Sequence, residues 1–163
     1  MQRRTIDARR RHLLQGAGGG TVLALMAAAG LLRPAPAWAE WNKQAFDVKN
    51  SLNDAVAALG GASPPQQSAE IAIKGPDIAE NGAVVPFEVT SKIPGTRNIA
   101  LLVEKNPNIL AANFSIPEGT DPWVNTRVKM AQTSNVIALV KGGDGKFYYA
   151  SKEVKVTLGG CGG

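Results

Sequence analysis

The chain has 163 residues and a formal net charge of +5, which at first suggests a nucleic acid or an anionic membrane as partner. The charge is unevenly placed, however. The first 39 residues hold six of the 18 basic residues and one of the 13 acidic residues, so residues 40–163 hold twelve of each. This neutral stretch lacks the basic surplus that nucleic-acid binding requires, and it is long enough for one domain with a sizeable core.

Residues 1–39 are predicted to be a cleaved export signal. A basic start is followed by an uncharged run rich in Gly, Ala and Leu, and then by "APAWA", in which Ala37 and Ala39 fit a small-x-small cleavage site. Arg10 and Arg11, followed by "HLLQ", are typical of a twin-arginine signal, which exports folded proteins to the bacterial periplasm. The alternative is an uncleaved membrane anchor, because the uncharged run could span a bilayer. After cleavage no membrane span is expected.

The first predicted element is an amphipathic helix over residues 40–59. Its apolar residues recur at intervals of three and four, which places them on one helical face; they are Trp41, Ala45, Val48, Leu52, Val56 and Leu59. Gly60 and Gly61 predict the end of the helix, and Pro64 and Pro65 mark a linker. A helix of this length is not stable alone, so its apolar face should pack on another element.

The rest of the chain predicts β-strands. Short runs rich in Val, Ile, Phe and Thr are separated by Gly, Pro, Asn and Asp; they are "IAIKG", "AVVPFEVTSK", "NIALLVEK", "AANFSI", "WVNTRVKMA", "SNVIALVK", "KFYYA" and "KEVKVTL". Eight such runs indicate an all-β protein, an antiparallel sandwich preceded by one helix. The folded domain, helix plus sandwich, is therefore expected over residues 40–158, with residues 159–163 as a tail.

Details of the strands lead to further expectations. In "KEVKVTL", Val154, Val156 and Leu158 alternate with polar residues and should face the core. "GGDG" at residues 142–145 predicts a hairpin turn. Pro86 has no amide donor, so its strand should be an edge strand or carry a bulge. The aromatic residues are expected in the core; they are Trp41, Phe46, Phe87, Phe114, Trp123 and Phe147.

The residue types present exclude several kinds of active site. The one histidine, His12, belongs to the export signal, so residues 40–163 have no histidine for a catalytic triad or a histidine-based metal site. Asp77, Glu80 and Asn81 do not have the spacing of a calcium-binding loop, and a solvated turn is the simpler interpretation. We expect no metal and no cofactor.

The remaining chemistry is at Cys161, the only cysteine of the chain, within "GGCGG" at the C-terminus. A lone cysteine in an oxidising compartment forms no intramolecular disulfide, which points to intermolecular pairing or to a reactive role. Its neighbours Gly159, Gly160, Gly162 and Gly163 have no side chains and accept almost any backbone conformation. The pattern predicts a flexible swinging arm. A catalytic cysteine would need a fixed base and a cleft, which a flexible terminus does not keep.

These residues carry a resemblance to a known family. "EVKVTLGGCGG", together with "IAENGAVVPFEVTS", "RVKMAQTSNV" and the twin-arginine leader, resembles SoxY, the sulfur-carrier subunit of the bacterial thiosulfate-oxidising Sox system. The resemblance implies an immunoglobulin-like sandwich preceded by a helix. It also implies a carrier that is not itself an enzyme, with Cys161 as the covalent attachment point for thiosulfate-derived intermediates and the four glycines as its arm.

The resemblance further implies partners. They are a SoxZ-like sandwich subunit in a heterodimer, the haem c-type enzyme SoxAX that joins thiosulfate to the cysteine, the hydrolase SoxB that releases sulfate, and the sulfane dehydrogenase SoxCD where present. Two alternatives stay open at this point. One is a sandwich scaffold or adhesin crosslinked through Cys161, and the other is a thiol-dependent sulfurtransferase.

Overall fold

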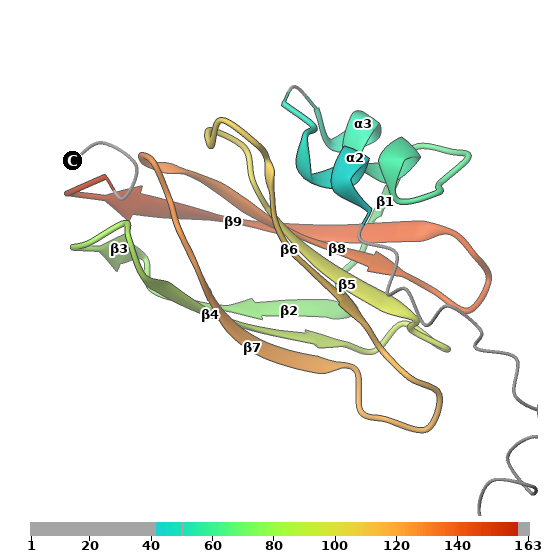
Figure 1. The fold of residues 1–163 in the computed structure, drawn as a ribbon. Helices are drawn as coiled ribbons and strands as arrows, with labels where there is room; N and C mark the ends of the chain where they lie inside the picture. Colours follow the sequence, from blue (N-terminus) through green and yellow to red (C-terminus); the bar gives the residue numbers. More distant parts are fainter. Residues whose placement is uncertain (1–41, 50, 160–163) are drawn as a thin grey trace, which may run out of the picture. The chain divides into compact units, whose positions relative to one another are not determined.

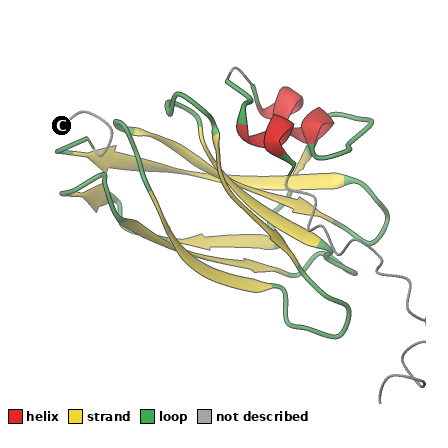
Figure 2. Cartoon of the chain, viewed as in Figure 1, coloured by secondary structure: helices red, strands yellow, loops and turns green. Residues whose placement is uncertain are grey.

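The computed structural model describes residues 42–49 and 51–159, and their backbone forms two β-sheets with two short helices beside one of them (Figure 1). Figure 2 shows the strands in two layers and the helices together on one side. The expected all-β class is confirmed at this level. Residues 1–41, which include the predicted export signal and Trp41, lie outside the described residues, as do residues 50 and 160–163.

The larger sheet has the strand order β1-β9-β8-β5-β6. Its long members are β5 (Asn98–Val103), β6 (Leu110–Ser115), β8 (Ser134–Lys141) and β9 (Phe147–Val156), and each pairs antiparallel with the next long strand in the order. Two short strands, β1 (Gln66–Gln67) and β3 (Ile78–Ala79), pair in parallel with opposite ends of β9. The last long strand of the chain is therefore held along both of its edges.

The smaller sheet has the order β2-β4-β7, formed by β2 (Ile71–Lys74), β4 (Val85–Ser91) and β7 (Trp123–Val128). The expectation that the strand with Pro86 is an edge strand or carries a bulge is wrong, because β4 lies between the other two and pairs with both in continuous register. Its pairing with β2 covers only Glu88 to Ser91, whereas its pairing with β7 covers Val85 to Thr90. Pro86 therefore lies beyond the end of β2, where no donor is required on that side.

The core between the sheets is formed by alternate residues of the facing strands. From the smaller sheet come Val85, Phe87, Val89, Val124 and Val128, and from the larger sheet Ile99, Leu101, Val103, Val136, Ala138, Val140 and Val154. The intervening residues of β5 and β8, among them Leu102 and Leu139, are buried against the helices instead. Burial on both faces explains why these two strands are almost continuously apolar in the sequence.

The single helix expected over residues 40–59 is instead two short helices, α2 (Lys43–Phe46) and α3 (Leu52–Ala58). Ser51 caps α3, because its Oγ accepts a 3.1 Å hydrogen bond from the amide of Asp54. The expected packing of the apolar face is confirmed for its described members: Ala45 and Val56 are buried in the cluster that covers the outer face of β5 and β8, and Val48, Leu52 and Leu59 are partly buried against it.

Two expectations about individual strands and side chains were wrong, and two were confirmed. "KFYYA" and "KEVKVTL" form one strand of ten residues, β9, rather than two. Trp123 is 51% exposed rather than in the core, whereas Phe87 and Phe147 are buried as expected. The hairpin at residues 142–145 is confirmed: it joins β8 to β9, and Gly145 has the positive φ of 78° that a glycine adopts without strain.

Candidate functional site at the end of β9

The site is the point where the chain leaves the sandwich, residues 157–159, which we call the root. Thr157 is held to the last residue of β3 and to the residue that follows it. Its amide donates a 3.0 Å hydrogen bond to the carbonyl of Ala79, and its hydroxyl donates one of 2.9 Å to the carbonyl of Glu80. One residue earlier, the amide of Val156 donates to the hydroxyl of Thr133 at 2.9 Å. Neighbouring loops thus continue the hydrogen bonding of β9 past its last residue.

Gly82 ties the root to the core. Its amide donates to the carbonyl of Leu158 at 2.7 Å, and its own carbonyl accepts from the amide of Met130, also at 2.7 Å. Met130 is fully buried in the core between the sheets. The root is therefore joined to a rigid part of the protein through a buried glycine.

Gly159 lies close to the backbone of Ala131. A Cβ atom at Gly159 would overlap the carbonyl oxygen of Ala131, and it would lie 3.3 Å from the carbonyl carbon. The Ala131 backbone is itself held, because its amide donates to Asn106 Oδ1 at 2.9 Å, while Asn106 Nδ2 donates to the carbonyl of Lys129 at 2.8 Å. Only glycine fits at position 159 without moving this loop.

The side chain of Leu158 does not enter the core, although its alternation with Val154 and Val156 predicted that it would. Val154 is fully buried, but Leu158 is 66% exposed because it lies beyond the last residue of β9. Ile78 and Val84, in the segments that meet at the root, are 58% and 57% exposed. Each of these three side chains is thus exposed, although it belongs to a segment close in sequence to a residue that bonds the root.

A charged pair lies beside the root. Lys152 Nζ forms a 2.8 Å ion pair with Asp77 Oδ1 and donates a 2.8 Å hydrogen bond to the carbonyl of Gly75. The hydrogen bond and the positive charge of Lys152 lower the pKa of the Asp77 carboxyl below its ordinary value. The amide of Lys155 also donates to the carbonyl of Asp77, at 2.9 Å, so this pair helps to fix the segment that leads into β3.

Of the site residues predicted from the sequence, the structure describes only Gly159. Gly160, Cys161, Gly162 and Gly163 lie outside the described residues. The residues that hold the root, namely Gly82, Met130, Ala131 and Thr133, were missed as site residues. They lie in loops or at strand ends, where no hydrophobic period indicates their role.

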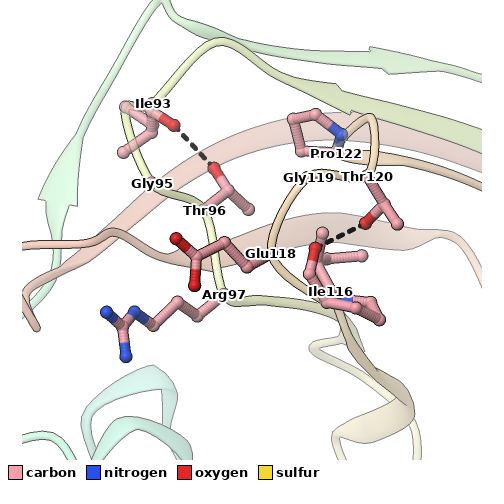
Figure 3. A pocket seen from close by; sticks show the side chains of 10 residues that line it. Ile93, Gly95, Thr96, Arg97, Ile116, Glu118, Gly119, Thr120 and Pro122 are labelled. Carbon is pink, nitrogen blue, oxygen red and sulfur yellow. Dashed lines mark hydrogen bonds between the residues drawn. The ribbon is translucent and has the colours of Figure 1, made fainter.

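The sandwich also has an open cavity of about 450 Å³ at its other end, between the loop at residues 93–97 and the loop at residues 116–122 (Figure 3). The hydroxyls of Thr96 and Thr120 donate to the carbonyls of Ile93 and Pro117 within their own loops. Arg97 and Glu118 both contribute side chains to the lining of this cavity. The ten residues of β9 separate this cavity from the root by about 30 Å, so a short C-terminal arm does not reach it.

Two further findings concern the described part of the chain. In residues 42–49 and 51–159, His, Cys, Asp and Glu side chains form no group of three that could hold a metal ion. Neither of the two helices described there has the length and hydrophobicity needed to cross a bilayer.

Comparison with known proteins identifies the family. Residues 56–161 match the family described as sulfur oxidation protein SoxY. The chain belongs to the SoxY family. The matched stretch begins within α3, covers both sheets and the root, and ends at Cys161. No curated protein matches the chain.

The solved structures include a SoxY relative. The structure titled sulfur carrier protein SoxY from Chlorobium limicola f thiosulfatophilum has 45% sequence identity to this chain and a TM-score of 0.59, and the match covers 66% of this chain and 96% of that one. A superoxide reductase (neelaredoxin) from Ignicoccus hospitalis has 20% identity and a TM-score of 0.47, over 53% of this chain and 79% of that one. That second similarity is too low to support a functional argument. The SoxY resemblance predicted from the sequence is confirmed.

Proposed function

We propose that this SoxY-family protein is a periplasmic sulfur carrier of thiosulfate oxidation, and that Cys161 is its covalent attachment point. The observation that carries the proposal is that the family match extends to residue 161, the only cysteine of the chain. The Chlorobium relative, 45% identical, is titled a sulfur carrier protein. The two-sheet architecture also supports the immunoglobulin-like class that the resemblance implied.

The chemistry of loading follows from the thiol. Cys161-SH and thiosulfate, S₂O₃²⁻, combine to Cys161-S-S-SO₃⁻ with release of one proton and two electrons, and the electrons pass to a haem c-type coupling enzyme of the SoxAX kind. A SoxB-like hydrolase then adds water, which releases sulfate and two protons and leaves the persulfide Cys161-S-S⁻. A SoxCD-like dehydrogenase, where present, would oxidise that sulfane sulfur. The chain itself supplies the thiol and the arm, and the catalytic groups belong to these enzymes.

The proposal extends to the partner subunit and the compartment. A SoxZ-like sandwich subunit would complete a heterodimer, and residues 1–39 would direct export through the twin-arginine pathway before cleavage. Two features support a carrier over an enzyme. Residues 40–163 contain no histidine to activate a nucleophile. In addition, Cys161 lies only two residues beyond a root that holds the chain at the surface of the sandwich.

The test is the intact mass of the protein produced with its leader in bacteria grown on thiosulfate and purified without reductant. We expect a chain beginning at Glu40, with reductant-sensitive additions of sulfur, sulfite or thiosulfate confined to the C-terminal peptide. Cys161→Ser is the control and should carry none of them. A mass with only free thiol and disulfide dimer would overturn the carrier proposal in favour of a crosslinked scaffold, and turnover by the isolated chain would favour a sulfurtransferase.

A further inference from the structure

The sequence contains one Asn-Gly pair, Asn81-Gly82, and it lies in the loop that holds the root. Asparagine deamidates most readily before glycine, because glycine has no side chain to hinder its own amide nitrogen. That nitrogen attacks the side-chain carbonyl carbon of the asparagine, ammonia leaves, and a cyclic succinimide remains. Water then opens the ring to aspartate or to isoaspartate. The overall reaction consumes one water, releases one ammonia, and needs neither an oxidant nor an enzyme.

The side chain of Asn81 is already arranged for this reaction. It is exposed to solvent, and its Oδ1 accepts a 2.8 Å hydrogen bond from the amide of Ala83. This is the turn that an asparagine side chain forms with the backbone two residues ahead, and it closes a ring that includes the Gly82 nitrogen. An amide donor at Oδ1 also stabilises the negative charge that this oxygen acquires when its carbon is attacked. The group that must be attacked is therefore both positioned and polarised.

The amide of Gly82, in contrast, is not available to attack. Gly82 is buried, and its N–H donates the 2.7 Å hydrogen bond to the carbonyl of Leu158. The nitrogen becomes a nucleophile only after it loses its proton to the solvent. A buried amide that is hydrogen-bonded loses its proton only when the structure around it opens. The bond between Gly82 and Leu158 therefore opposes the reaction directly.

We propose that Asn81 is a deamidation site that the root keeps unmodified. While the carbonyl of Leu158 holds the amide of Gly82, Asn81 persists. When the C-terminal segment leaves the surface of the sandwich, the amide is released and Asn81 converts to aspartate or isoaspartate. The proposal is independent of the carrier function, because it depends only on the bonds of the root.

Conversion to isoaspartate makes the loss of the root permanent. The main chain of isoaspartate passes through the former side chain and is longer by one carbon–carbon bond, about 1.5 Å. Gly82 is held from both sides, at its amide by Leu158 and at its carbonyl by Met130, so an extension directly before it does not preserve both 2.7 Å bonds. Aspartate keeps the original backbone length, and its carboxylate still accepts a hydrogen bond from Ala83. Only the isoaspartate product therefore prevents the root from forming again.

The experiment follows deamidation in the mature chain at mildly alkaline pH, for the original protein, Gly159→Ala and Gly160→Ala. Peptide chromatography with mass spectrometry quantifies aspartate and isoaspartate at position 81, and NMR measures hydrogen exchange of the Gly82 amide. The methyl group of Gly159→Ala overlaps the backbone of Ala131 and displaces the root, whereas Gly160→Ala adds it one residue beyond the root. We expect Gly159→Ala to accelerate both processes about fivefold, the factor that corresponds to about 1 kcal/mol, and Gly160→Ala to change neither.

Two controls make the outcome decisive. The original chain unfolded in urea gives the rate without the root, which should exceed the native rate by about tenfold or more. Exchange of the β8 amides should be equal in all three proteins; if Gly159→Ala accelerates it, Thr157→Val, which removes only the hydroxyl bond to Glu80, takes its place with the same expected direction. Native deamidation as fast as in urea would overturn the proposal. Equal rates in the variant and its control, or faster deamidation without faster Gly82 exchange, would also overturn it.

Discussion

The carbonyl of Leu158 accepts a 2.7 Å hydrogen bond from the amide of Gly82, although 75 residues separate them in the chain. Gly82 is buried, and its carbonyl in turn accepts from the amide of the buried Met130. The exit point of the C-terminal segment is consequently set by the interior of the sandwich and not by the tail itself. The C-terminal segment therefore leaves the sandwich from a defined point.

Gly159→Ala should disturb that exit point. The added methyl group would overlap the Ala131 carbonyl oxygen, so either the loop or the root must move. We expect a loss of about 1 kcal/mol in the free energy of unfolding, the lower end of the range for overpacking, because the position is at the surface. Enzymatic loading of Cys161 should also slow. Urea unfolding and the loading assay measure the two effects.

The control for that change is Gly160→Ala, which places the same methyl group one residue beyond the root. It should not alter the unfolding free energy by a measurable amount. Equal effects of the two substitutions would mean that position 159 is an ordinary part of the arm.

Leu101→Ala should destabilise the sandwich strongly. Leu101 is fully buried between the sheets, so its truncation loses apolar contacts and leaves a cavity, which costs about 2–5 kcal/mol in the free energy of unfolding. Leu158→Ala removes the same atoms from a side chain that is 66% exposed and should change the unfolding free energy by less than about 0.5 kcal/mol. A large loss in the second variant would show that Leu158 is buried in solution.

Ser51→Ala should loosen α3. The serine hydroxyl is the acceptor for the amide of Asp54 at the start of this helix, and loss of such a cap costs about 0.5–2 kcal/mol. Amide hydrogen exchange should accelerate at Asp54 more than in β5 or β8. Ser151→Ala, at an exposed position of β9, serves as the control and should change neither measurement. Uniform acceleration throughout the sandwich would contradict a local capping role.

Asp144→Asn should lower the pKa of Tyr148. The Tyr148 hydroxyl donates a 2.8 Å hydrogen bond to Asp144 Oδ2, and this bond to a carboxylate raises the pKa of the phenol above its ordinary value of 10.0. Without the negative charge, the phenol should ionise closer to that value. An absorbance titration in a Tyr149→Phe background isolates the signal of Tyr148. An unchanged titration would contradict the hydrogen bond.

The same pair makes hairpin stability depend on pH in both directions. The amide of Lys146 and the Tyr148 hydroxyl lower the pKa of Asp144, so its stabilising contribution is present at neutral pH and is lost as pH falls through the lowered value, below 3.8. The pKa of Tyr148 is raised, so its contribution is present below pH 10.0 and is lost as pH rises through the raised value. Both losses should be smaller in Asp144→Asn.

The strands buried on both faces were the easiest part of the fold to predict, because an unbroken apolar run such as that of β8 fits few other structures. The break between α2 and α3 was harder to predict. Apolar residues keep their helical spacing across the break. The signal for a new helix start consists of only two residues, Ser51 and, three positions later, Asp54. Ser151, between the runs "KFYYA" and "KEVKVTL", divided β9 into two predicted strands, yet strand residues that face solvent need not be apolar.

The root could not be predicted because it depends on contacts between distant loops. Nothing in the sequence near Gly82 or Ala131 indicates that their backbones meet Leu158 and Gly159. The alternation within "KEVKVTL" continues to Leu158, whereas the strand ends at Val156, so the pattern predicted burial for a side chain that is exposed. Cys161 could be predicted as the attachment point from the sequence alone because it is the only cysteine of the chain, and its role stays a prediction.

The two short strands beside β9 have a consequence for aggregation. An edge strand with a long row of unpaired backbone groups is a template for strands of other chains. On β9, however, β1 occupies Tyr148 and Tyr149, and β3 occupies Lys155 and Val156, so only the five residues between them remain open. Lys152, a charged residue of the kind that discourages strand addition, lies in the middle of that gap. If other chains add strands to the larger sheet, they should do so at β6.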